Sequence, residues 1–200
     1  GEVSGPALVR AAQRGRGTDG SWDLCDVPGV LWRQKGAIFV QPAAARLRDL
    51  EAIAPAWHLV DLSRYAGINI ITSRGCPFPC SFCSVAPVWG RKPVLRRVEG
   101  IVAEMEWLHE RAGCELFLFQ DEYFLSSSDR VRALCEAMQS RGLRFRWKAF
   151  GRIDQTDEPT MRAMARGGCI ELRFGVESGS DRILSRVVKG FHAQRAHEVL

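Results

Sequence analysis

Residues Ile68–Cys83 read INIITSRGCPFPCSFC, and this stretch decides the fold class and the chemistry of the chain. Its first part, 68–72, is short and apolar and predicts a buried strand. A loop follows with Cys76, Cys80 and Cys83, separated by three and then two residues. Three thiolates so close together can hold a cubane [4Fe–4S] cluster and leave one iron without a cysteine ligand. That open iron could bind a substrate or a cofactor.

Other interpretations of the three cysteines are weaker. A structural zinc site needs four ligands, usually as two close pairs, and the other cysteines and the histidines form no second pair. Three adjacent cysteines cannot all pair as disulfides, and the total of seven is odd. An inert packing loop fits poorly with Gly75, Pro77 and Pro79, which suit a loop wrapped around a bound group. Zinc and an inert loop remain as alternatives.

Composition limits the class of protein. Two hundred residues, 46% hydrophobic and 26% charged, suit one soluble globular core with a small appendage. The net charge of +5 is modest and its basic residues are scattered, so we expect solvated faces and no nucleic-acid partner. No apolar run is long enough to span a bilayer, so no membrane association is expected. Seven cysteines without an export signal predict a cytoplasmic location.

Two regions differ in pattern. Residues 1–66 have little periodicity and are interpreted as a lead-in or linker, with a hairpin at Gly29–Val40 and a short helix at Ala43–Ile53. Residues 67–200 are regular and form the main domain. The chain begins without Met and stops within a helical pattern, which suggests a piece of a longer protein.

From residue 67 onward, apolar strands alternate with amphipathic helices. We expect strands at 68–72, 115–119, 144–150 and 170–176, and helices at 98–112, 127–142, 157–167 and 180–188. This alternation predicts parallel βαβ units in an α/β barrel or a doubly wound sheet. In either fold, chemistry lies at the carboxyl ends of the strands. The loops after all four strands should therefore meet at one mouth.

The cysteine motif after a first strand, with Phe82 before the last cysteine, resembles the signature of the radical S-adenosylmethionine (radical SAM) superfamily. The resemblance covers roughly Leu62 to Leu200. It implies a partial (β/α)6 barrel, TIM-like, with about four βα units in this chain. It also implies a [4Fe–4S] cluster whose open iron binds S-adenosylmethionine, and reductive cleavage of that cofactor to a 5′-deoxyadenosyl radical.

Later motifs resemble the cobalamin-dependent branch of that superfamily. They are Phe119–Phe124, the W-x4-R-x-D pattern of Trp147 to Asp154, and Gly175–Ser180. Residues 1–66 resemble the tail of an upstream cobalamin-binding domain, so cobalamin is a further implied cofactor, although the hallmark D-x-H-x-x-G is absent. Gln120-Asp121-Glu122 also replaces the Gly-Gly-Glu of the superfamily.

The resemblance implies roles for single residues, each with a plainer alternative. Cys76, Cys80 and Cys83 would be the cluster ligands. Phe82 would shape the adenine pocket or merely pack within the loop. Asp121 or Glu122 would accept hydrogen bonds from the methionyl ammonium, or stand as carboxylates at a helix start.

The remaining predicted site residues follow the third and fourth strands. Glu177 would contact the ribose hydroxyls or cap the next helix. Lys189 would pair with the methionyl carboxylate or lie in solvent. Arg152 would point into the mouth as a catalytic residue beside Asp121. Arg173 would also reach the cofactor, or pair with Glu171 or Glu115 on the sheet.

The predicted function is that of a radical SAM enzyme, either a cobalamin-dependent methyltransferase or a radical cyclase. Its expected partners are a small-molecule substrate and a flavodoxin or ferredoxin as electron donor. One alternative is a methylthiotransferase acting on tRNA or a ribosomal protein. Another is a non-catalytic iron–sulfur or zinc module, which would not need the polar motifs after the later strands.

Overall fold

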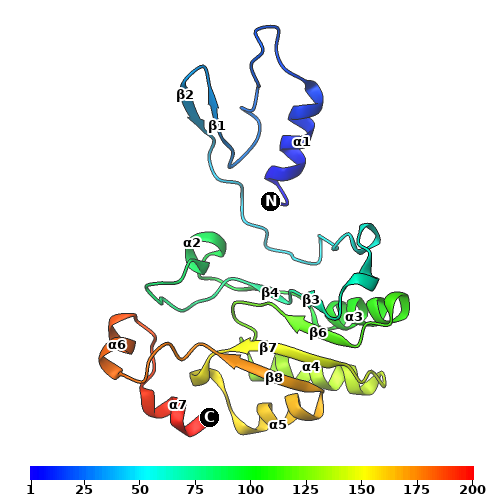
Figure 1. The fold of residues 1–200 in the computed structure, drawn as a ribbon, viewed down its shortest axis with the longest axis vertical. Coiled ribbons are helices and arrows are strands. Elements are labelled where there is room, and N and C mark those ends of the chain that lie inside the picture. Colours follow the sequence, from blue (N-terminus) through cyan, green and yellow to red (C-terminus); the bar gives the residue numbers. More distant parts are fainter. The chain divides into compact units, whose positions relative to one another are not determined.

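A computed structural model describes all residues from 1 to 200, in two compact units, Gly1–Arg48 and Asp49–Leu200. The second unit is built on a parallel sheet in the order β3-β6-β7-β8 (Figure 1). Its strands are β3 (Ile68–Ile70), β6 (Leu116–Phe119), β7 (Arg146–Gly151) and β8 (Cys169–Phe174). All four predicted strands exist, and their parallel pairing confirms the α/β prediction.

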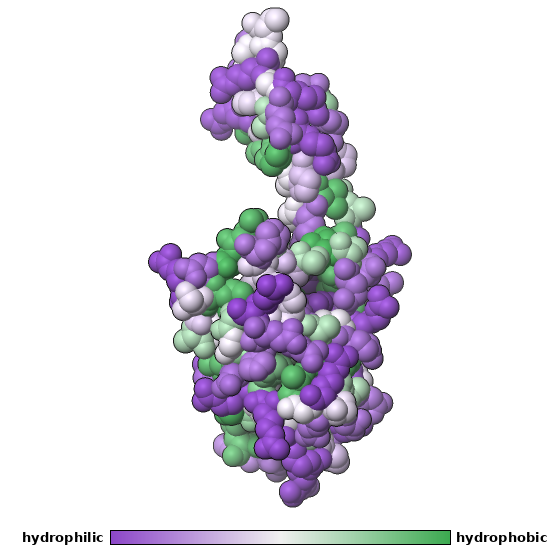
Figure 2. Space-filling model, turned by 90° about the vertical axis from the view of Figure 1, so that its right-hand side faces the viewer, coloured by the Kyte–Doolittle hydropathy of each residue, from purple (hydrophilic) through white to green (hydrophobic).

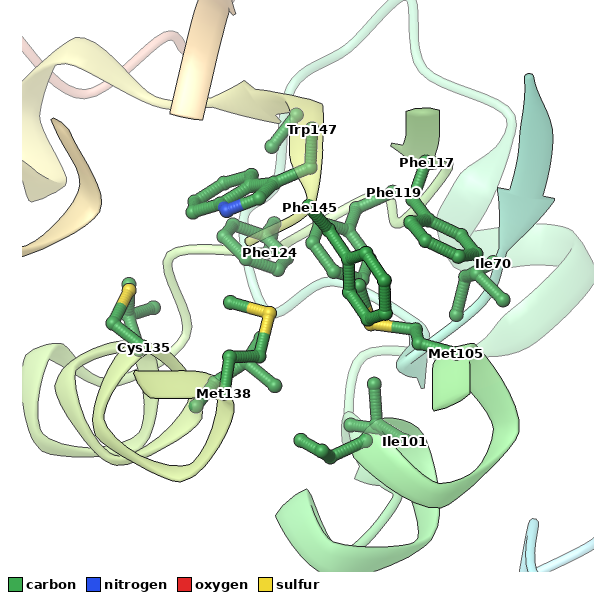
Figure 3. Packing of buried hydrophobic residues seen from close by; sticks show 14 of the residues in the cluster. Ile70, Ile101, Met105, Phe117, Phe119, Phe124, Cys135, Met138, Phe145 and Trp147 are labelled. Atoms are coloured by element: carbon green, nitrogen blue, oxygen red, sulfur yellow. The ribbon is translucent and has the colours of Figure 1, made fainter. Parts of the chain in front are cut away.

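The connecting helices cover one face of this sheet (Figure 1). They are α3 (Val98–Ala112), α4 (Ser128–Ser140) and α5 (Glu158–Arg166). Figure 3 shows the side chains of the sheet and of α3 and α4 meeting in one core. The Phe119 ring stacks on Phe124 with centroids 4.9 Å apart and meets the edge of Trp147 at 5.3 Å. This aromatic packing fixes β6 against β7, and thereby the ends of both strands.

Local side chains set the helix ends where the sequence predicted them. The Ser127 side chain accepts from the Arg130 N–H at the start of α4, and Asp157 accepts from Thr160 at the start of α5. Gly113, with φ 62°, ends α3 in the left-handed region that glycine tolerates. These ends keep the connections short, so each helix returns directly to the next strand.

The opposite face of the sheet is mixed in character, since Phe150, 40% exposed, lies there beside Arg173. Lys148 Nζ donates to Glu171 Oε2 at 2.5 Å across β7 and β8 on this side. The strands β3 and β8 each have only one neighbour and form the two edges of the sheet. The sheet is thus an open, partial barrel wall.

Residues 49–66 belong with the second unit, so the division falls before the predicted boundary at 66. Trp57 Nε1 donates to Glu104 Oε1 at 2.7 Å, and Glu51 accepts from the backbone of Arg97 at 2.9 Å. The predicted helix at Ala43–Ile53 is wrong. The Asp49 carboxylate accepts from the Glu51 N–H at 2.9 Å, and this local turn replaces a helical hydrogen bond. Two short 3-10 turns follow, Trp57–Leu59 and Leu62–Arg64.

The first unit consists of a helix and a hairpin around a small core. The predicted hairpin is confirmed as β1 (Leu31–Gln34) and β2 (Ala37–Val40), and Lys35 and Gly36 turn it with φ 50° and 81°. The helix α1 (Ser4–Arg14) was not predicted. That this unit is the tail of a cobalamin-binding domain stays a prediction.

The surface is mixed in character. On the face shown in Figure 2, hydrophilic residues predominate and hydrophobic ones lie among them in small groups. None of the helices combines the length and the apolar character that crossing a bilayer requires. The remaining elements are β4 (Ser73–Arg74), α2 (Val85–Trp89), β5 (Val94–Leu95), the 3-10 turn Ile153–Gln155, α6 (Asp181–Arg186) and α7 (Ala193–Val199).

Candidate active site

The cysteine loop leaves the sheet directly after β3. At the start of the loop, strand β4 pairs with β5. The backbone N–H of Cys76 then donates to the carbonyl of Gly90 at 3.4 Å. Further along, Ser81 N donates to the carbonyl of Val187 at 3.0 Å, which attaches the loop to the end of α6. These two backbone contacts hold the loop from Cys76 to Ser81 in place.

The three cysteines are free thiols of intermediate exposure. Burial raises the pKa of Cys76, the Arg152 guanidinium opposes this shift, and Cys80 and Cys83 reinforce it. No group of three or more His, Cys, Asp or Glu side chains is arranged to hold a metal ion. A cubane cluster spreads three thiolates over three different irons, and thiolate is the ligand type that such clusters use. In donor type and number, the loop fits a [4Fe–4S] cluster.

Asp121, after β6, holds the strand exit that leads into the cysteine loop. It is only 2% exposed. Its Oδ1 accepts from Thr72 N at 2.6 Å and Ser73 N at 2.9 Å, and its Oδ2 accepts from the Thr72 hydroxyl. Burial raises the pKa of Asp121, while these hydrogen bonds and Arg130 act in the opposite direction. Both carboxylate oxygens are occupied, which argues against Asp121 as a ligand contact and makes it a structural anchor.

Glu122 lies closer to the loop and is less constrained. Its Oε2 accepts a long hydrogen bond of 3.4 Å from the backbone of Gly75, just before the first cysteine. Of the two adjacent carboxylates, Glu122 is therefore the one whose oxygens are available to a ligand.

Arg152, at the end of β7, reaches the cysteine loop. Its side chain is 9% exposed, and Nε and Nη2 donate to the two carboxylate oxygens of Asp154, each at 3.0 Å. Nη2 also donates to the carbonyl of Lys189 at 2.5 Å, and Nη1 lies 3.5 Å from Cys80 Sγ. The guanidinium carbon sits 3.6 Å above the ring centroid of Phe78. The buried Arg152 guanidinium thus contacts the residues after β7, the segment after α6 and the cysteine loop.

Glu177 and Lys189 form an ion pair in the mouth. Lys189 is 6% exposed, and its Nζ donates to Glu177 Oε1 at 2.9 Å and lies 5.6 Å from the ring centroid of Phe82. Glu177 adopts a φ of 71°, an unusual conformation for a residue with a side chain. A Cβ on Gly175 would lie 2.5 Å from Glu177 Oε1, so this glycine makes room for the ion pair.

Arg173 does not lie with the other predicted site residues. Its side chain is 57% exposed and pairs with Glu171, as the plainer alternative expected, and lies 5.8 Å from the Phe150 ring centroid. The other predicted residues do meet: the loops after β3, β6, β7 and β8 touch one another through the contacts above. The predicted convergence of the four loops is therefore confirmed.

Sequence reasoning missed two contributors. Phe78 supports the Arg152 guanidinium and meets Tyr123 edge-on, with centroids 5.2 Å apart. An aromatic residue between Pro77 and Pro79 was a usable signal. Thr72 carries the Asp121 contact, and nothing in a short apolar strand marked its hydroxyl.

These features define a class of protein: a parallel α/β domain whose first strand delivers three thiols to the carboxyl edge of the sheet, among carboxylates, a lysine and an arginine from the later loops. The family model described as "Radical SAM superfamily" matches residues 70–199. The chain belongs to the radical SAM superfamily. The predicted family is confirmed.

Similar proteins are known. The chain is 29% identical over 98% of its length to an uncharacterized methyltransferase of Pyrococcus horikoshii, and spans 43% of that protein. It is 26% identical over 89% of its length to an anaerobic magnesium-protoporphyrin IX monomethyl ester cyclase of Synechocystis sp., and spans 37% of it. Its fold matches the cobalamin-dependent S-adenosylmethionine radical enzyme OxsB, solved with aqua-cobalamin and S-adenosylmethionine bound, with a TM-score of 0.79 at 21% identity, over 98% of this chain and 29% of that one. The chain thus spans less than half of each of these three proteins.

Proposed function

We propose that this chain is part of the catalytic barrel of a cobalamin-dependent radical SAM methyltransferase that acts on a small molecule. The observation that carries the proposal is the meeting of the three free thiols with the ends of all four parallel strands. The cluster that these thiols fit supplies, when bound, the electron that cleaves the sulfonium of S-adenosylmethionine and yields a 5′-deoxyadenosyl radical. The methyltransferase name of the Pyrococcus relative and the cobalamin in the OxsB structure support the narrower assignment.

The side chains of the mouth have the chemistry that S-adenosylmethionine requires. The Glu122 carboxylate can accept from an ammonium, and Lys189 can pair with a carboxylate. Glu177 offers two oxygens to a vicinal diol, and Phe82 offers a ring face to a purine. Without a ligand, Lys189 and Glu177 form an ion pair with each other at 2.9 Å. When S-adenosylmethionine binds, this ion pair would be replaced by one contact of Lys189 with the carboxylate and one contact of Glu177 with the diol.

The test uses the full-length protein, reconstituted with iron and sulfide without oxygen. After addition of S-adenosylmethionine and reductant, we expect a [4Fe–4S] absorption and 5′-deoxyadenosine by mass spectrometry. Variant Cys80→Ala should lose both signals, whereas Cys135→Ala, which removes a thiol buried in the core, should keep them. A cluster-free protein that binds one zinc ion would refute the proposal.

Cobalamin dependence and the electron donor are tested separately. With methyl-labelled S-adenosylmethionine, the label should appear on added cobalamin and then on the product. We expect a flavodoxin or ferredoxin to replace a chemical reductant. A radical cyclisation is the second candidate, favoured by the Synechocystis relative. It predicts 5′-deoxyadenosine formation without transfer of the label to product.

A further inference from the structure

The contacts of Arg152 fit a role toward the cluster ligand better than a role toward substrate. An arginine side chain has five N–H donors. Asp154 takes one from Nε and one from Nη2, the carbonyl of Lys189 takes the second from Nη2, and Cys80 Sγ faces Nη1. One donor remains on a side chain that is 9% exposed. The guanidinium is therefore already committed to the protein.

Its position next to sulfur has an electrostatic consequence. A thiolate that ligates a cluster carries negative charge, and one-electron reduction adds more. Hydrogen bonds to the cluster sulfurs and nearby positive charge favour the reduced form, and thereby raise the reduction potential. Arg152 supplies both features, since its charge is permanent and its Nη1 lies 3.5 Å from Cys80 Sγ.

The surrounding residues keep this donor in place. The Phe78 ring lies 3.6 Å below the guanidinium carbon, and Asp154 binds the opposite edge with two oxygens. Phe78 belongs to the cysteine loop itself, two residues before Cys80. The loop therefore provides both the surface on which the cation rests and the sulfur to which it donates.

We propose that Arg152 is a positioning residue that holds Cys80 through an N–H···S hydrogen bond and raises the reduction potential of the cluster. The inference rests on the proposed function, because it requires that Cys80 is a cluster ligand. It gives Arg152 a role toward a cluster ligand, whereas the resemblance implied a catalytic residue that points into the mouth.

The test is a redox titration of the reconstituted full-length protein, followed by the electron paramagnetic resonance signal of the reduced cluster. Variant Arg152→Gln should reduce the ratio of reduced to oxidised cluster about tenfold at a given potential, which corresponds to about 59 mV for one electron. Arg152→Lys should shift it less, since the charge remains. The control is Arg132→Gln, which removes a partly buried arginine that pairs with Asp129 and Asp157; its potential should equal that of the wild type.

The outcomes separate the two proposals. A wild-type protein without a [4Fe–4S] signal refutes the proposed function. A wild-type cluster whose potential is unchanged in Arg152→Gln overturns the role of Arg152 alone. If Arg152→Gln cannot retain a cluster, Arg152→Lys and Asp154→Asn decide, because the latter frees the guanidinium from its main anchor. Wild-type potentials in both would overturn the inference.

Discussion

Removal of the Asp121 carboxylate should loosen the exit of β3 and with it the cysteine loop. In Asp121→Ala, the buried N–H groups of Thr72 and Ser73 lose their acceptor. Each unsatisfied buried donor costs about 1–3 kcal/mol, so the loss should be about 2–6 kcal/mol. The Thr72 hydroxyl also loses its partner, although it can rotate toward another acceptor. A loss of this size is a large part of the stability of an ordinary domain, about 5–15 kcal/mol.

Urea denaturation followed by circular dichroism measures this loss. Asp121→Asn keeps an oxygen for both N–H groups, so it should cost clearly less than the alanine variant. The control is Asp129→Ala, because the Asp129 side chain is 92% exposed and should change stability by less than about 0.5 kcal/mol. The alanine variant of Asp121 should also release iron faster to a chelator, because Thr72 lies four residues before Cys76. If Asp121→Ala matches the Asp129 control in stability and iron retention, the anchor role is refuted.

Three further predictions follow from the fold. Asp157→Ala should cost about 1 kcal/mol at pH 7, while Asp157→Asn, which can also cap, should cost little. Because hydrogen bonds, chiefly with a serine hydroxyl, hold the pKa of Asp157 below 3.8, the part of its contribution that depends on charge is present above that value and is lost as the pH falls through the lowered pKa; wild type should therefore lose stability relative to Asp157→Asn on acidification, and a difference that stays constant with pH would contradict this. Gly168→Ala should prevent folding, since φ is 91° and its Cβ would lie 2.0 Å from the carbonyl oxygen of Phe145; a folded, soluble variant in circular dichroism would refute this. Burial raises the pKa of Cys135 to about 12 and that of Cys169 to about 11, so iodoacetamide at pH 8 should leave both unmodified in the native protein, as peptide mass analysis would show.

Periodicity predicted the framework of the second unit well, because each element there is amphipathic or fully apolar and has its own end signals. The helix at Val98–Ala112 agrees residue for residue, and the caps of α4 and α5 are Ser127 and Asp157, the residues at which those two helices were predicted to begin. The helix at Ala43–Ile53 failed because alanine and leucine content favoured it, while the Asp49 side chain makes a turn that competes with helical hydrogen bonding.

The site was predictable in location but not in every contact. The rule that strand ends carry chemistry placed the loops after all four strands together, and the structure confirms it. Whether Asp121 or Glu122 faces the mouth depends on which side chain the Thr72 backbone captures, and no spacing rule encodes that choice. Arg173 alternates with the core-facing Leu172 and Phe174 along β8, and a partner on its own strand holds it on the exposed face.

The open edges of the parallel sheet affect how the chain associates with itself. A closed barrel satisfies the outer backbone groups of every strand, but β8 is paired only with β7 and keeps one flank open. Ile170, 52% exposed, adds an apolar side chain to that flank. At high protein concentration, this open border should favour intermolecular β-pairing between copies of the chain.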